Sequence, residues 1–211
     1  MSLAVPRTVA AWHAMEGNEV YRLLSLGRSV PPDSIDRALA GLDVALDWVP
    51  SGDRYVMRAA AELEHYLRHT ATADRGTWLA RTARDLEAGL AANPADGRAS
   101  LALAYVRAWQ GAGGRDVVVG LLHSMDTMPS LRMLWPARST AFLAAWRDLT
   151  PDEAAAVRSQ LRAIWQNEPD MWTSLVVTAR AAGRLDELSA ALAGEPTARA
   201  ELERLRAAPA R

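Results

Sequence analysis

Glu62, His65 and His69 are the residues whose types and spacing come closest to a site of chemistry. In a helix, separations of three and seven residues place these side chains on one face, where carboxylate and imidazole groups can bind a metal ion. The His-Glu-x-x-His spacing of zinc proteases does not occur in the sequence. Since two histidines fall together on a polar helix face easily by chance, we interpret the group as a solvated face and predict no metal.

No set of residues matches a catalytic motif. Ser124 and Asp126 lie beside His123, but groups this close in one helix cannot align as a triad, and the Gly-x-Ser-x-Gly turn is missing. The glycines of segment 111–114 follow a predicted helix rather than a strand, so they indicate a helix end and not a phosphate loop. We therefore predict no catalytic residue and no cofactor.

The composition excludes further classes of chemistry. The chain of 211 residues contains no cysteine, and all 24 of its basic residues are arginine. Thiolate nucleophiles, disulfides, iron–sulfur clusters and Schiff-base lysines are thereby excluded. The net charge is −1, whereas a dedicated nucleic-acid binder carries a basic surplus, so we predict no nucleic-acid partner.

The N-terminus bears on contact with a membrane. No stretch of the sequence approaches the roughly 20 apolar residues of a membrane helix, and no signal peptide is recognisable. The start Met1–Arg7 fits two alternatives, a native beginning or a boundary just after an apolar anchor. We expect membrane contact only through such an anchor, which would precede the N-terminal helical segment 1–30.

The fold class follows from the helix formers and the turn residues. Alternating strand patterns are scarce, whereas alanine, leucine, arginine and glutamate dominate, so we predict an all-α fold. Pro136 either kinks its helix or marks the true start of that helix. Proline, glycine and capping residues predict one or two helices over 8–26 and single helices over 31–48, 54–70, 74–92, 98–110, 115–125, 131–149, 151–167, 169–182, 184–192 and from 195 onward.

Three of the predicted turns share one register. Each proline follows two large apolar residues at spacings of four and eight, in the sets Leu42/Leu46/Pro50, Leu86/Leu90/Pro94 and Leu161/Trp165/Pro169. This pattern suggests a repeated helix–turn–helix unit, and single hairpins must stack to bury their apolar faces. We therefore predict one helical-repeat domain over 1–211, made of stacked hairpins and ending in a helical tail at 195–211.

Two segments resemble known repeats. Segment 93–97, Leu103-Ala104 and Gly111 resemble the boundary between two tetratricopeptide (TPR) units, and segment 179–188 has a similar character. The resemblance implies an irregular TPR-like superhelix and a non-enzymatic interaction or scaffold domain that binds a protein or peptide.

A looser resemblance covers most of the chain. The order of its motifs is similar to that in helical-repeat domains of proteobacterial envelope proteins; the motifs are Pro31-Pro32, 45–48, Asn93-Pro94, 131–138, 146–149 and 160–162. It implies a membrane-tethered, periplasmic protein, with a cytoplasmic location as the alternative. A glycan-binding accessory domain of polysaccharide assembly and a helical enzyme of unrecognised type stay open as alternative functions.

Tryptophan is the unusual aromatic residue, with eight copies against one phenylalanine. Packing between helices and an aromatic groove for a glycan or peptide both explain this bias. The residues on the predicted apolar stripes are Trp48, Trp78, Trp109, Trp146, Trp165 and Trp172.

The resemblance to TPR units also predicts a binding surface. In such stacks the first helix of each hairpin lines the concave surface, and here these helices follow Pro50, Pro94 and Pro169. The arginine fork binds carboxylates at two points, so we predict that this surface meets a peptide or an acidic group, with a plain solvated face as the alternative. The predicted partner-binding residues are Arg54, Arg58, Glu62, His65, His69, Arg98 and Arg107.

Overall fold

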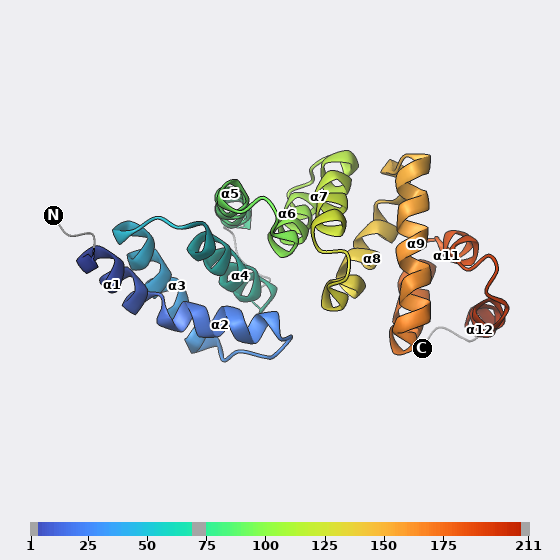
Figure 1. Ribbon diagram of the computed structural model, residues 1–211, viewed down its shortest axis with the longest axis horizontal. Helices are drawn as coiled ribbons and strands as arrows, with labels where there is room; N and C mark the ends of the chain where they lie inside the picture. Colours follow the sequence, from blue (N-terminus) through green and yellow to red (C-terminus); the bar gives the residue numbers. More distant parts are fainter. Residues whose placement is uncertain (1–3, 69–74, 208–211) are drawn as a thin grey trace. The chain divides into compact units, whose positions relative to one another are not determined.

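The protein is all-helical, as predicted. The computed structural model describes residues 4–68 and 75–207, and within these ranges it contains twelve α-helices, three short 3-10 helices and no strand (Figure 1). Of the residues in these ranges, 83% are helical, well above the third that is usual for globular proteins. None of the described helices is both long and apolar enough to cross a membrane.

The chain divides into two compact units, Met1–Ala112 and Gly113–Arg211, called unit 1 and unit 2 below. Unit 1 contains α1 (Ala4–His13), α2 (Met15–Ser25), α3 (Pro32–Trp48), α4 (Gly52–Arg68), α5 (Arg75–Ala92) and α6 (Gly97–Trp109). Glycines with positive φ follow α2 and α6, namely Gly27 at +66° and Gly111 at +78°. Both helix ends lie where the glycines predict them, because only glycine adopts this backbone region without strain.

One core cluster of unit 1 forms where α4, α5 and α6 pack together, and further buried apolar clusters lie among α1 to α4. The buried side chains of the first cluster are Val56, Ala59, Leu79, Ala83, Leu86, Ala99, Leu103 and Val106. Small residues bring α4 and α5 close: a Cβ at Gly89 would lie 2.4 Å from Cγ2 of Val56, and one at Gly52 would lie 2.4 Å from Cβ of Ala92. Helix α6 is buried on more than one side, as its apolar sequence predicts.

The described part of unit 2 contains six α-helices and three short 3-10 helices. They are α7 (Gly114–Thr127), η1 (Arg132–Leu134), α8 (Trp135–Ala144), η2 (Trp146–Asp148), α9 (Pro151–Asn167), η3 (Pro169–Met171), α10 (Trp172–Ala181), α11 (Leu185–Ala191) and α12 (Pro196–Ala207). The prediction of one helix over 131–149 is wrong, since three segments occupy it. Pro136 is the second residue of α8 and so marks a true helix start, where its missing N–H costs no hydrogen bond.

Helix packing explains most of the tryptophans. Three are buried (Trp135, Trp146 and Trp172), and Trp78, Trp109 and Trp165 are half-buried. The rings of Trp165 and Trp172 meet edge to face with centroids 5.1 Å apart. Trp48 departs from this pattern, because half of its surface is exposed, and Trp12 is 71% exposed.

Candidate functional site

Two of the predicted binding residues of α4, Arg58 and Glu62, face other helices. Helix α4 packs against α3 and α5 (Figure 1), and the side chain of Arg58 is 15% exposed. Glu62 is 2% exposed. The interpretation of Glu62, His65 and His69 as a solvated face is therefore wrong for Glu62, which lies inside unit 1.

Arg58 joins three helices through its guanidinium group. Its Nε donates to Oδ2 of Asp85 at 2.6 Å and its Nη2 donates to Oδ1 of the same carboxylate at 2.7 Å. Its Nη1 donates to Oδ1 of Asp43 on α3 at 2.7 Å. Burial alone lowers the pKa of Arg58, but the hydrogen bonds to Asp85 and Asp43 outweigh burial and raise the pKa above its ordinary value.

Arg81 extends this group of charges along α5. Its Nη2 donates to Oδ1 of Asp43 at 2.5 Å, and its Nε lies 2.6 Å from Oε1 of Glu62. The second oxygen of Glu62 lies 2.7 Å from the hydroxyl of Thr82. Burial raises the pKa of the Glu62 carboxyl above its usual value, and the Thr82 and Arg81 contacts oppose that shift. We call Asp43, Arg58, Glu62, Arg81, Thr82 and Asp85 the α3–α5 network.

Four members of this network were missed from the sequence. Arg81 and Thr82 each lie near Asp85 on the surface of α5, because they precede it by four and three residues in the helix. Asp43 comes from α3. The spacing on α5 was a readable signal, but it does not say which helix lies opposite.

The remaining predicted residues of α4 have different partners. Arg54 donates from Nη1 to the carbonyl oxygen of Val49 at 2.6 Å, just after the end of α3. Nδ1 of His65 lies 3.2 Å from a carboxylate oxygen of Asp36, and the His65 ring packs 5.8 Å from that of Trp78. His69 lies outside the described residues. The structure thus brings Arg58 and Glu62 together and places Arg54 and His65 at other contacts.

The two predicted arginines of α6 lie near the surface. Arg107 pairs with Glu87 of α5 at 3.2 Å, and both side chains are partly exposed. Arg98 is half-buried beside the N-cap of α6, where the carboxylate of Asp96 accepts from the backbone N–H groups of Arg98 and Ala99. Arg107 is therefore a predicted arginine that forms an ion pair in which both side chains are partly exposed.

Unit 2 buries a second arginine that the sequence analysis did not single out. Arg138 is fully buried, and its Nη2 donates to the carbonyl oxygens of Ser124 and Met128 at 2.9 and 3.3 Å. Burial lowers its pKa to about 10, so the group stays charged at neutral pH. The C-terminal carbonyls of α7 carry partial negative charge, and they stabilise this cation.

The chemistry open to these groups is limited by their burial. Glu62 and Asp85 are buried among protein atoms, so these two carboxyl groups hold helices together and are closed to a substrate, whereas Asp43 of the same network is partly exposed. Within residues 4–68 and 75–207, no group of three or more histidine, cysteine, aspartate or glutamate side chains is arranged to hold a metal ion.

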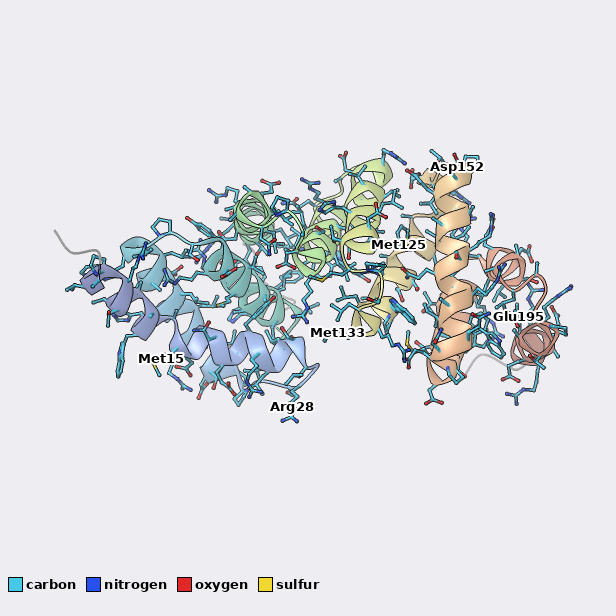
Figure 2. All side chains as sticks on the ribbon, in the orientation of Figure 1. Met15, Arg28, Met125, Met133, Asp152 and Glu195 are labelled. Atoms are coloured by element: carbon cyan, nitrogen blue, oxygen red, sulfur yellow. The ribbon has the colours of Figure 1, made fainter. Side chains whose placement is uncertain are left out.

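A different surface of unit 1 exposes large apolar side chains. Val5, Trp12 and Met15 are 65%, 71% and 59% exposed. Their spacings of seven and three residues keep them near one side of the helical segment that runs through α1 into the start of α2. Figure 2 shows Met15 on the outer side of the α1–α2 junction. We call these three residues the α1 face.

No known protein family, curated protein or solved structure matches this chain.

Proposed function

We propose that the chain is a non-enzymatic protein–protein interaction or scaffold domain built from irregular TPR-like hairpins. The observation that supports it best is the α1 face. Exposed apolar side chains that gather on one surface are typical of protein contacts, and tryptophan contributes strongly to such interfaces because it buries a large area at little entropic cost. The structure holds Ala10 and Ala14 buried on the opposite side of the same segment, so the α1 face is presented outward.

The predicted charged surface has a second part in this proposal. Arg107 and Glu87 are accessible to a partner, whereas Arg58 and Glu62 hold α4 against its neighbours. We propose that a protein or peptide partner covers the α1 face and that charges such as Arg107 add specificity at the edge of a contact. An envelope location and a membrane tether remain part of the proposal through the resemblance to envelope proteins alone.

The test places a photo-crosslinking amino acid at position 12 of the full chain in the native host. We expect one discrete protein adduct from this position, and we expect Met15→Glu to abolish it because a charge cannot be buried in an apolar contact. The matched control places the same amino acid at position 177, since Val177 of unit 2 is 62% exposed. Equal labelling at both positions, or no adduct at position 12, would count against the proposal.

Glycan binding is the alternative function that one observation favours. The rings of Tyr66 and Trp109 lie 5.6 Å apart and those of Tyr66 and Trp78 lie 5.1 Å apart, and both tryptophans are half-buried. Partly exposed indole rings can stack on the apolar faces of sugars. Saturable quenching of tryptophan fluorescence by host polysaccharide fragments, lost in Trp109→Leu, would favour this alternative over a protein partner.

A further inference from the structure

The hydroxyl group of Thr82 has two acceptors and one hydrogen atom. Its Oγ1 lies 2.7 Å from Oε2 of Glu62 and 3.1 Å from the carbonyl oxygen of Trp78, one helical turn earlier. An ionised Glu62 can only accept, so the hydroxyl could then donate to one of the two oxygens but not to both; the Trp78 carbonyl also accepts the helical N–H of Thr82. If Oε2 carries a proton, it donates to Thr82, and Thr82 donates to Trp78. Both short contacts become hydrogen bonds in this arrangement.

The charges of the α3–α5 network favour the same proton. Two guanidinium groups, those of Arg58 and Arg81, face the three carboxyl groups of Asp43, Glu62 and Asp85. Full ionisation therefore leaves one negative charge in excess, in a site where Glu62 and Asp85 are buried while Asp43 and Arg81 are partly exposed, and an excess charge is costly where it is buried. One proton removes the excess. The two acceptors around the Thr82 hydroxyl and the excess of carboxyl groups over guanidinium groups are separate observations. Protonation of Glu62 accounts for both.

We propose that Glu62 is a neutral carboxylic acid in the folded protein, with its proton on Oε2, and that release of this proton weakens the contact between α4 and α5. Of the three carboxyl groups, Glu62 is assigned the proton because Asp85 already receives two hydrogen bonds from Arg58 and Asp43 is partly exposed to solvent. The network then makes the strength of the contact between α4 and α5 depend on pH. This inference does not depend on what the domain binds.

In the described part of unit 1, other charged side chains around α4 have ion-pair partners of their own. On α4 itself, His65 is directed to Asp36 of α3. Helix α2, which also packs on α4, holds its own charges in surface pairs, Arg22 with Glu19 and Glu16 with Arg37 of α3. From α5, only Arg81 forms an ion pair with Glu62, and it shares its guanidinium with Asp43.

The direction of the pH effect follows from the burial of Glu62. Its pKa is raised above 4.5, chiefly by burial. The folded state therefore binds more protons than the unfolded state between 4.5 and the raised value. The contribution of Glu62 to stability is complete below the unfolded pKa and is lost as the pH rises through the folded pKa.

The direct test is infrared spectroscopy of the full chain labelled with ¹³C-carboxyl glutamate. We expect a protonated-carboxyl band that persists above pH 4.5, disappears in Glu62→Gln and is unchanged in Glu87→Gln, a partly exposed glutamate of α5. Arg81→Met should extend the band to higher pH, because Arg81 is the cation that favours ionisation. A wild-type band that vanishes at or below pH 4.5, or one that survives Glu62→Gln, would overturn the proposal.

A second readout is the pH dependence of urea unfolding. The neutral Glu62→Gln variant should lose less stability than the wild type as the pH rises from 4.5 to 8, and Glu87→Gln should follow the wild type. Parallel wild-type and Glu62→Gln profiles over this range would also overturn the proposal. The wild-type infrared band is measured without any substitution. Its disappearance at or below pH 4.5 would therefore overturn the proposal even if a variant failed to fold.

Discussion

Arg58 and Asp85 meet through two parallel hydrogen bonds across the contact between α4 and α5. The pair is largely buried, with side-chain exposures of 15% and 6%. A planar guanidinium and a carboxylate match in this two-point geometry, so the pair fixes the register of the two helices.

We predict that Asp85→Ala lowers the free energy of unfolding by about 3–5 kcal/mol, because it leaves Arg58 as a buried cation without its main partner. The Arg58→Met/Asp85→Leu double variant should recover much of this loss, since two apolar side chains can replace a buried ion pair. Urea denaturation gives both values. Glu87→Ala on the same helix removes a partly exposed pair and should change stability by at most about 1 kcal/mol. Equal effects of Asp85→Ala and Glu87→Ala would contradict the prediction.

Two glycines of α5 should respond to alanine with opposite signs. A Cβ at Gly89 would lie 2.4 Å from Cγ2 of Val56, whereas a Cβ at Gly76 meets nothing within 4 Å. We predict that Gly89→Ala destabilises unit 1 by about 1–3 kcal/mol through overpacking. Gly76→Ala should instead stabilise it by up to about 1 kcal/mol through helix propensity. Thermal unfolding distinguishes them, and a stabilising Gly89→Ala would show that α4 and α5 are less tightly packed.

Leu103 tests the importance of α6 for the core. It is buried among residues of α4 and α5, so Leu103→Ala should leave a cavity and cost about 2–5 kcal/mol. Leu67→Ala is a suitable control, because Leu67 is an exposed leucine of the same unit and its loss should cost less than about 1 kcal/mol. Near-neutral unfolding of Leu103→Ala would refute a central place for α6 in the core.

Unit 2 should lose stability in acid through Glu153. This carboxylate accepts hydrogen bonds from Arg115 of α7 and from the backbone N–H of Thr150, and its pKa falls to about 2. The unfolded state binds more protons as the pH falls from 4.5 to 2, so the contribution is present above 4.5 and is lost through this window.

The side chain of Arg115 is half exposed, so we expect an effect on the order of 1 kcal/mol rather than the full value of the shift. Glu153→Gln should flatten the stability profile in this window, and Glu203→Gln, an exposed acid of unit 2, should not. Identical slopes for wild type and Glu153→Gln, measured by urea unfolding at each pH, would exclude this role.

The sequence by itself determined where most helices begin and end. Thr150 and Glu153 form the reciprocal hydrogen bonds of a capping box around Pro151, and Gly27 takes the positive φ that ends α2. These signals are local, because each acts within one turn of its own helix. Where two local signals compete, as around Pro136, the sequence leaves the outcome open.

Only the tertiary structure decided what the polar face of α4 does. From the sequence, Glu62 was interpreted as part of a solvated face and Arg58 as part of a binding surface, because the periodicity of a helix gives the direction of a side chain but not what lies opposite. Asp43 and Asp85 are 15 and 27 residues away from Arg58 along the chain. Their contact depends on the packing of α3 and α5 against α4, and that packing is set by apolar shape at positions such as Gly89 and Val56.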